Sequence, residues 1–511
     1  MIPLFLIVVV GALASLALTP VIREAAQRVQ FVDRPDGKRK VQETSVALGG
    51  GLVLLLAGTV TTVFACSTTK FAGVVVEEQN WSLLSLLFGA IVLCVVGLVD
   101  DLRGMRGGYK LLWQVIVSSI IVGTGLMIDK VNVFGLVVPL GVFGFLFSLL
   151  WILAAINSFN LIDGIDGLAT TVGLILSLTI GVMAAYTGKT VDAAIAFALA
   201  GTLLGFLRYN YAPASIYLGD AGSMLIGLVL GTLALRCTFK EAATLAFAGP
   251  LAIWAIPMFD SVAALLRRKL TGRSMYATDR GHIHHRLLTR GLSAKQAVAL
   301  IGGLCLITAG AAVTALVTGY DFVGPVAVVF VIGALTTTRL FGHTELMLLN
   351  SRVFGIGRVL AGRGVGLEDA NQTQSRNTHI QIQGTLSWEK SWQAIVESAS
   401  RFSLVEIRLN VTVPQRHEDF FASWKARGKA PNEGCWSIRV PLRNETDYLG
   451  KLFVAGVEDE HGSKQQISEF LDFVDGIEQQ LSDVLVAPTE LHDTRIEEPR
   501  ATTDEVAALS D

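Results

Sequence analysis

The sequence predicts a polytopic α-helical membrane protein with about 11 transmembrane helices and a small C-terminal cytoplasmic α/β domain. Two observations lead to this prediction. Of the 511 residues, 52% are hydrophobic and only 16% are charged, whereas a soluble protein carries about 25% charged residues. The excess of apolar residues fills residues 1–341 and then stops. The N-terminal run has no basic segment before it, so we interpret it as a retained first span.

The transmembrane domain, residues 1–341, contains the predicted spans. A membrane-spanning helix needs roughly 20 mostly apolar residues. Segments that meet this requirement lie near residues 2–22, 46–66, 82–99, 111–128, 133–156, 165–185, 190–207, 221–236, 241–264, 296–318 and 322–341.

The charges in the loops between these spans predict their orientation. With the N-terminus outside, the inner loops hold 18 Lys and Arg residues and the outer loops hold four. Positive charges gather on the cytoplasmic side of membrane proteins. The motifs described below are therefore all expected at the cytoplasmic face.

Beyond residue 341 the composition changes. Residues 342–379 form a linker rich in Gly, Arg and polar residues, and residues 487–511 form an acidic tail that we expect to be disordered. Between them, residues 380–486 contain four alternating, β-branched segments, "HIQIQG", "LVEIRLNV", "CWSIRVPL" and "GKLFVAGV", which predict strands. Two segments with helical spacing, "SWQAIVESASRF" and "QISEFLDFVDGIEQQLSDVL", predict helices. This region is thus a small cytoplasmic α/β domain, and we expect it to be a regulatory or interaction appendage.

Charge and cysteine content exclude several classes of protein. The net charge is only −2, so nothing indicates a nucleic-acid partner. The five cysteines are scattered and show no CxxC or metal-type spacing, which argues against a disulfide or zinc framework.

The stretch "GLVDDLRGMRGGYK" places Asp100 and Asp101 where the third span meets the cytoplasm. Adjacent carboxylates repel each other and both ionise readily only beside a cation. Arg103 and Arg106 can neutralise them, in which case the pair is only the charged end of a helix. Both interpretations stay open on this motif alone.

The stretch "NSFNLIDGIDGLA" puts polar groups beside the membrane. Asn157, Asn160, Asp163 and Asp166 are spaced by three residues, so on a helix they share one face. An Asx- and Gly-rich turn between two spans is the structural alternative. We favour a functional role, because such residues are costly at a membrane unless they have one.

A third acidic position is Asp220 in "RYNYAPASIYLGDAGSMLIG", directly before the small residues that open the next span. The carboxylate can cap that helix. It can also bind Mg²⁺, which prefers one or two carboxylates together with phosphate oxygens and water.

The most basic loop, residues 267–291, places His282, His284 and His285 among arginines that include Arg280. Three histidines suggest zinc, but adjacent histidines without a cysteine suit a tetrahedral centre poorly. Histidine and arginine together suit phosphate binding better. A positive-inside topology signal explains the arginines but not the histidines.

At these residues the chain resembles the polyprenyl-phosphate N-acetylhexosamine-1-phosphate transferases, glycosyltransferase family 4. The resemblance covers residues 1–341 and rests on four motifs in the family's order. They are "VDD" at 99–101, "NLIDGIDGLA" at 160–169, "YLGDAGS" at 217–223 and "GHIHHRLL" at 281–288. The last motif resembles the branch that transfers N-acetylglucosamine-1-phosphate for O-antigen, enterobacterial common antigen or teichoic acid.

The resemblance implies a reaction in the bacterial inner membrane, the first membrane step of cell-envelope polysaccharide synthesis. A UDP-N-acetylhexosamine and undecaprenyl phosphate would give a lipid-linked diphosphosugar and UMP, with Mg²⁺ or Mn²⁺ as cofactor. The lipid bilayer is then a partner, and a homodimer is one open arrangement of the chain.

The same resemblance implies roles for single residues. Metal ligands would be Asp220 and Asp101. The implied catalytic residues are Asp100, Asp101, Asp163, Asp166 and His282. The implied substrate-binding residues are Lys110, Asn157, Asn160, Asn210, Arg280, His284 and His285.

One departure from the family pattern lies in the first inner loop. The family usually has "RKxHxxPxPxxGG", and here Gln42, Ser45 and Ala47 stand at the histidine and proline positions. A weaker grip on the substrate or an altered sugar selectivity is our hypothesis for this change.

Two other functions compete with the transferase. An ion-coupled transporter predicts acidic residues near the middle of the spans, whereas these lie at cytoplasmic ends. A membrane-anchored sensor or scaffold would act through residues 380–486, which show no nucleophile–base pair and no phosphate-binding loop.

Overall fold

The computed structural model forms two compact units, Met1–Val365 and Gly366–Asp511. The residues that the structure describes are 4–33, 45–68, 81–133, 136–239, 248–270, 281–347, 349, 376–383, 388–413, 418–426, 435–443, 448–457 and 467–475.

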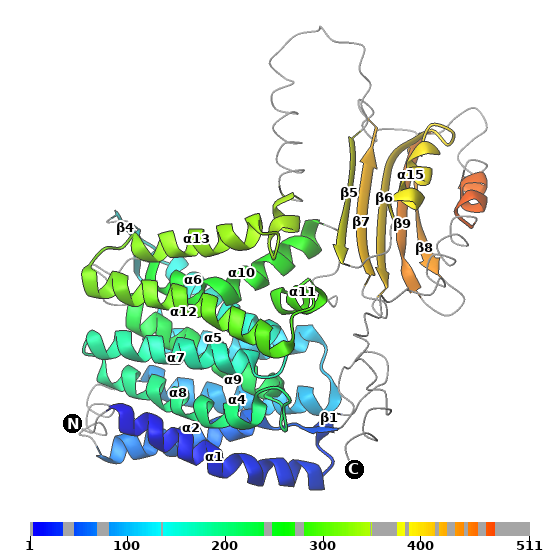
Figure 1. Ribbon diagram of the computed structural model, residues 1–511. Coiled ribbons are helices and arrows are strands. Elements are labelled where there is room, and N and C mark those ends of the chain that lie inside the picture. Colours follow the sequence, from blue (N-terminus) through cyan, green and yellow to red (C-terminus); the bar gives the residue numbers. More distant parts are fainter. Residues whose placement is uncertain are drawn as a thin grey trace, which may run out of the picture. The chain divides into compact units, whose positions relative to one another are not determined.

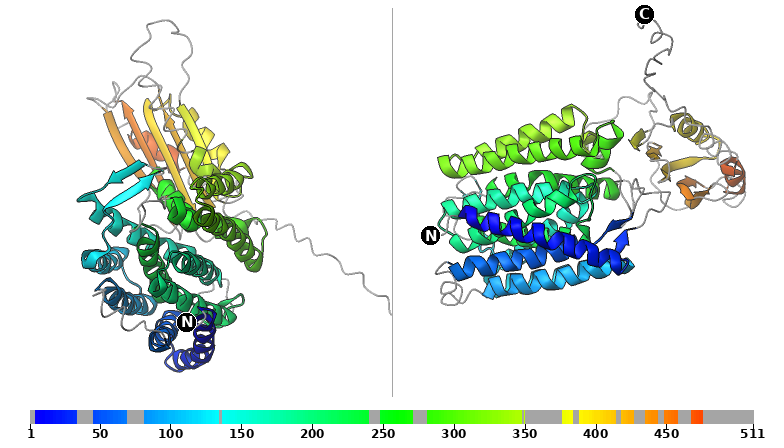
Figure 2. Two further views of the ribbon diagram at one scale, coloured as in Figure 1. Left: turned by 90° about the vertical axis from the view of Figure 1, so that its left-hand side faces the viewer. Right: turned by 60° about the horizontal axis from the view of Figure 1, so that its bottom comes forward.

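The first unit is a bundle of apolar helices that lie side by side with roughly aligned axes (Figure 1 and Figure 2). Its longer helices are α1 (Leu4–Arg28), α2 (Gly50–Thr68), α4 (Trp81–Arg103), α5 (Gly107–Ile121), α6 (Phe143–Ile162), α7 (Leu168–Tyr186), α8 (Thr190–Asn210), α9 (Gly219–Ala234), α10 (Ala248–Leu270), α12 (Ala294–Thr318) and α13 (Val323–Thr337). The one-to-two-turn helix α11 (Ile283–Thr289) precedes α12, and π-helical turns η1 (Val122–Leu126) and η2 (Leu235–Phe239) extend α5 and α9.

Eight helices within the described residues are long and apolar enough to cross a membrane. Each of the 11 predicted spans overlaps one of the longer helices, but α2, α10 and α13 are not among those eight. The chain is therefore a polytopic helical membrane protein, and a count of 11 crossings stays a prediction. Large apolar side chains on the outer surface of the bundle, such as Phe5, Phe88 and Phe330, are more than half exposed, as a lipid-facing surface requires.

One predicted span is wrong in its position. The span predicted at residues 133–156 begins only at Phe143, because the preceding residues pair as the antiparallel strands β3 (Lys130–Val133) and β4 (Leu136–Pro139). Alternating β-branched residues favour strand pairing, and they made this stretch apolar enough to resemble part of a helix.

Helix α9 forms the centre of the bundle. Every residue from Ala221 to Ala234 is buried, and α2, α4, α6, α7 and α8 all pack against it. The N-terminal end of α9 carries Asp220, so the residues that hold this helix also position that carboxylate.

Glycines allow the close approach of neighbouring helices to the start of α9. A Cβ atom on Gly97 of α4, or on Gly51 of α2, would overlap the Ala221 backbone. The amides of Gly50 and Gly51 donate to the carbonyls of Tyr217 and Leu218, each at 3.1 Å. The glycines next to the first inner loop therefore support the acidic end of α9.

The second unit is a five-stranded antiparallel sheet in the order β5-β7-β6-β9-β8. Its strands are β5 (Arg376–Gln383), β6 (Leu404–Val413), β7 (Glu418–Lys425), β8 (Cys435–Arg443) and β9 (Tyr448–Val457). Helix α15 (Glu389–Glu397) and a helix at residues 467–475 contribute Trp392 and Phe470 to a shared apolar core with the sheet.

The four predicted strands of this unit are present, and the sequence analysis missed β7. The strand contains adjacent Phe420 and Phe421, which break the simple alternation of apolar and polar residues. Both rings are nevertheless buried, although successive side chains of a strand point to opposite faces. The acidic tail lies outside the described residues.

The glycine contacts at α9 give a stability prediction. We expect Gly97→Ala to lower the thermal stability of the detergent-solubilised protein, because the new methyl group meets the Ala221 backbone; overpacking typically costs about 1–3 kcal/mol. Gly58→Ala in α2 is the matched control, since nothing lies within 4 Å of a Cβ atom there. The control should be neutral or stabilising, because alanine favours helix over glycine. Equal melting temperatures for the two variants would contradict the packing at α9.

Candidate active site

Asp101 connects the end of α4 to the start of α9. Its Oδ1 accepts the Asp220 amide hydrogen at 2.8 Å, and its Oδ2 accepts that of Ala221 at 3.4 Å. Gly219 has a φ of +71°, and a Cβ atom there would meet the Asp101 carboxylate. Asp101 thus stabilises the positive end of the α9 dipole and fixes the backbone that carries Asp220.

Lys110 of α5 joins the other two carboxylates. Its ammonium lies 3.1 Å from Oδ2 of Asp100 and also contacts Oδ2 of Asp220. It donates to Oδ1 of Asn160 at 3.1 Å. Asn160 in turn donates to Oδ1 of Asp220 at 2.6 Å and to Ser223 at 3.0 Å. The structure therefore brings α4, α5, α6 and α9 together in one polar network.

The charges of this network leave an excess of negative charge. Asp100 and Asp220 contact the Lys110 ammonium, and Asp101 adds a third carboxylate beside them at the start of α9. Carboxylate and amide oxygens are ligands that suit Mg²⁺. Within the described residues no three Asp, Glu, His or Cys side chains converge as a complete metal site. The donor set fits a cation that takes its remaining ligands from water or from substrate phosphates.

The stretch "NSFNLIDGIDGLA", which connects α6 to α7, is part helix and part turn. Asn157 and Asn160 lie on α6, which ends at Ile162, so the predicted shared helical face does not extend to Asp163 and Asp166. Gly167 has a φ of +77°, a conformation that glycine adopts readily, and it separates α6 from α7. Asp163 follows the helix, and Asp166 lies in the turn.

The two aspartates of this turn have different surroundings. Burial, together with the charges of Asp220, Asp101 and Asp166, raises the pKa of the Asp163 carboxyl well above its usual value. Asp166 accepts the Ala214 amide hydrogen at 2.8 Å, so it ties the turn to the loop before α9.

Two predicted substrate-binding asparagines make hydrogen bonds inside the protein. Asn157 donates to Gln114 and to the Leu153 carbonyl, both at 2.8 Å. Asn210 accepts from Thr170 at 2.6 Å and donates to the Ile216 carbonyl at 3.0 Å. These bonds support the elements around the acidic network, and substrate binding by either residue stays a prediction.

The histidines form a row at the start of α11. The His282 and His284 rings are stacked, 5.9 Å apart and inclined by 7°, and His285 lies 4.3 Å from His284. A Cβ atom on Gly164 would overlap the His284 ring. The histidine motif therefore contacts the turn that carries Asp163 and Asp166, although about 120 residues separate the two in the sequence.

His284 is buried and its two ring nitrogens have no hydrogen-bond partner within the described structure. Burial, with a further contribution from His285, lowers its pKa to about 3. The ring is therefore neutral at physiological pH and can serve as a donor or an acceptor.

Two arginines hold α11 against the rest of the unit. Arg267 of α10 and Arg286 of α11 both pair with the buried carboxylate of Glu345, and both guanidinium groups lie over the Phe341 ring. The sequence analysis missed Glu345, which lies in the predicted linker.

Sequence reasoning also missed Ser223, Gln114 and Asp260. Asp260 carried a signal, because it is the one acidic residue in the apolar stretch "GPLAIWAIPMFDSVAALL". The predicted residue Arg280 lies outside the described residues.

The structure describes two of the three residues at which the first inner loop departs from the family pattern. Gln42 lies outside the described residues, and Ser45 is exposed. Ala47 is fully buried, and its carbonyl accepts the Tyr217 amide hydrogen at 2.9 Å. At Ala47 the chain thus contributes backbone pairing to the loop before α9, and the hypothesis of altered sugar selectivity stays untested.

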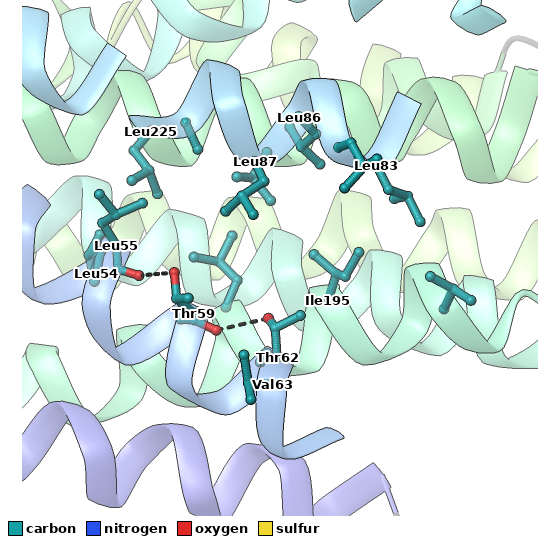
Figure 3. A pocket seen from close by; sticks show the side chains of 17 residues that line it. Leu54, Leu55, Thr59, Thr62, Val63, Leu83, Leu86, Leu87, Ile195 and Leu225 are labelled. Carbon is teal, nitrogen blue, oxygen red and sulfur yellow. Dashed lines mark hydrogen bonds between the residues drawn. The ribbon is translucent and has the colours of Figure 1, made fainter. Parts of the chain in front are cut away.

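An apolar groove of about 240 Å³ lies between α2 and α4, with α8 and α9 as its floor (Figure 3). Leu55, Leu86, Ile195 and Leu225 are among its lining residues. The hydroxyl of Thr59, on the same wall, donates to the Leu55 carbonyl at 2.7 Å. The groove presents a hydrocarbon surface to whatever enters it.

Comparisons with known proteins agree on one family. Residues 83–238 match the sequence profile of glycosyl transferase family 4. The chain is 34% identical over 295 residues to the probable undecaprenyl-phosphate N-acetylglucosaminyl 1-phosphate transferase of Bacillus subtilis, covering 57% of this chain and 79% of the relative. It is 31% identical over 326 residues to the decaprenyl-phosphate N-acetylglucosaminephosphotransferase of Mycobacterium tuberculosis, covering 58% and 79%. It is 30% identical over 286 residues to the undecaprenyl-phosphate alpha-N-acetylglucosaminyl 1-phosphate transferase of Escherichia coli, covering 55% and 75%.

The neutral state of His284 gives a prediction of pH dependence. Its pKa falls from an ordinary value of 6.5 to about 3 on folding, so the unfolded chain takes up a proton first as the pH falls. As the pH falls below about 6.5, protonation of His284 in the unfolded chain should progressively lower the free energy of unfolding. The loss should end near pH 3, where the folded ring also takes up a proton. His284→Asn should lose this component of the acid sensitivity.

Melting temperatures of the wild type and His284→Asn, measured in detergent between pH 7.5 and pH 4, check this prediction. The difference between the two curves isolates the histidine, because the titrating carboxylates are common to both proteins. Parallel curves across this range would show that His284 does not titrate as its burial requires.

Proposed function

The chain belongs to glycosyl transferase family 4, the polyprenyl-phosphate N-acetylhexosamine-1-phosphate transferases, and we propose that it transfers GlcNAc-1-phosphate from a UDP-sugar to undecaprenyl phosphate. The lipid phosphate oxygen attacks the phosphorus that bears the sugar. The bond between that phosphorus and UMP then breaks, and UMP leaves with the electron pair. The product is a lipid-linked diphosphosugar.

The observation that carries this proposal is the meeting of the four motifs. Asp100, Lys110, Asn160 and Asp220 form one network, and the His284 ring contacts Gly164 next to it. The excess of carboxylates suits a divalent cation, and the histidines suit phosphate groups. A reaction between a diphosphate and a monophosphate needs both kinds of group in one place.

The structure refines the roles that we assign to the acids. Asp100 and Asp220 share the Lys110 ammonium, and we propose that this pair would hold Mg²⁺ or Mn²⁺ in the active enzyme. The ion would neutralise developing negative charge on the phosphates. Asp101, the other predicted metal ligand, accepts two amide hydrogens of α9 and would act mainly by fixing Asp220.

Other side chains would contact the substrates directly. Lys110 can contact the attacking phosphate, because its ammonium lies between the carboxylates. Asp163 retains its proton more readily than an exposed carboxyl does, so it can donate a hydrogen bond to a phosphate or to the nucleotide. His282, His284 and His285 would bind the diphosphate or the sugar.

The setting of the reaction follows from the chain's spans. The eight helices of the described residues that are long and apolar enough to cross a membrane, together with bacterial relatives, support a multi-pass bacterial membrane protein. We place the N-terminus outside, and the site and the C-terminal unit in the cytoplasm, because the inner loops carry most of the positive charge. The lipid acceptor then reaches the site from the bilayer and the nucleotide-sugar from the cytoplasm.

The two competing functions fit the geometry less well. A transporter requires acidic residues along a path through the membrane, whereas Asp100 and Asp101 lie in the last turn of α4 and Asp220 in the first turn of α9. A sensor acting through the C-terminal unit gives no reason for four motifs of the first unit to converge.

Transfer of label from UDP-[¹⁴C]GlcNAc to undecaprenyl phosphate by the purified protein in nanodiscs tests the proposal. Label should enter the lipid fraction with Mg²⁺ present, stop with EDTA, and return to UDP-GlcNAc when UMP is added. Asp220→Asn should lower the rate by roughly 10²–10³-fold, as the removal of one charge-stabilising group typically does.

The matched control is Asp129→Asn, which removes an exposed carboxylate beyond the opposite end of α5 from Lys110. It should transfer label at the wild-type rate. Full activity of Asp220→Asn beside an active wild type would refute the site, and no incorporation by the wild type would refute the function.

A further inference from the structure

Asp260 is a buried acid that has no role in the proposed reaction as described above. It lies in α10, and only 1% of its surface is exposed. Its two oxygens contact the histidine motif: Oδ2 lies 3.0 Å from Nδ1 of His282, and Oδ1 accepts the Ile283 amide hydrogen at 2.9 Å. One carboxylate thus holds both the ring of His282 and the first amide of α11.

The contact with Oδ2 of Asp260 determines which nitrogen of the His282 ring carries the proton. A buried carboxylate needs hydrogen-bond donors to offset its lost hydration, so the proton of His282 is placed on Nδ1. A neutral histidine carries a proton on only one ring nitrogen. In the neutral ring Nε2 is then the lone-pair nitrogen, and a ring that flips or changes tautomer loses the bond to Oδ2 of Asp260, while the Ile283 amide still occupies Oδ1.

The orientation of His282 extends to the rest of the row. Its ring is parallel to that of His284, which contacts Gly164 in the turn beside Asp163. The His282 ring thus lies between Asp260 of α10 and His284 of α11. His285 contacts His284 in turn. A displaced His282 ring would move the row against the acidic turn.

We propose that Asp260 is a positioning residue, which sets the tautomer and orientation of His282 and thereby aligns the histidine row with the acidic network. This inference rests on the proposed transferase function for its kinetic consequence only. Outer partners of this kind, which fix a histidine that acts on a substrate or metal, typically contribute about 10–100-fold to activity.

Asp260→Asn is the informative variant, because it keeps the size of the side chain. The amide oxygen can still accept the Ile283 amide hydrogen, but the amide nitrogen must face Nδ1 of His282 as a donor. The tautomer should therefore change from Nδ1–H to Nε2–H. Ser261→Ala is the matched control on the next position of α10, where the hydroxyl donates to the Pro257 carbonyl at 3.0 Å.

Two measurements on the full-length protein in lipid bilayers decide the proposal. Solid-state NMR of ¹⁵N-histidine-labelled protein, with the His282 signals identified by their loss in His282→Gln, should show the Nδ1–H tautomer in the wild type and in Ser261→Ala. Asp260→Asn should show Nε2–H. An unchanged His282 tautomer in Asp260→Asn would overturn the proposal.

Kinetics provide the second measurement. Asp260→Asn should lower kcat by roughly 10–100-fold with little change in KM for the UDP-sugar, whereas Ser261→Ala should match the wild type. The double variant of Asp260→Asn with His282→Gln should be no slower than His282→Gln alone, because Asp260 acts through that ring. Multiplied losses would indicate a separate, structural role and contradict the inference. If the wild type transfers no sugar, the proposed function fails, and the nitrogen spectra still decide the role of Asp260.

Discussion

The Asp101 carboxylate accepts two amide hydrogens at the start of α9, and the position of the remaining charged groups depends on this contact. Helix α9 is buried along its length, so its acidic end cannot move independently of the helices around it. The small residues Gly51 and Gly97 let α2 and α4 approach that end. Packing in the apolar bundle thereby sets the geometry of a polar network.

A shortage of positive charge is the main electrostatic feature of this network. Lys110 serves Asp100 and Asp220 together, and like charges held this close favour a further cation or a proton. The raised pKa of Asp163 is a second consequence of the same crowding, added to its burial.

Two buried carboxylates hold the residues of α11 and His282 against the rest of the first unit. Asp260 holds His282 and the first amide of α11, while Glu345 pairs with Arg267 and Arg286. Both acids are nearly inaccessible to water, where loss of one partner would leave a buried charge uncompensated. His282 and α11 are therefore held against the bundle by these contacts.

The sequence by itself determined the helical membrane class, the approximate spans, four strands of the second unit and the motifs with Asp100, Asp163, Asp220 and His282. These depend on local composition and spacing, which a single segment contains. Only the tertiary structure decided that Lys110 bridges two carboxylates, that residues 130–139 pair as strands, and that Asp260 and Glu345 hold α11. Such contacts join residues far apart in the chain, as Lys110 and Asp220 are by 110 positions, and no local pattern encodes which distant partner a buried charge will meet.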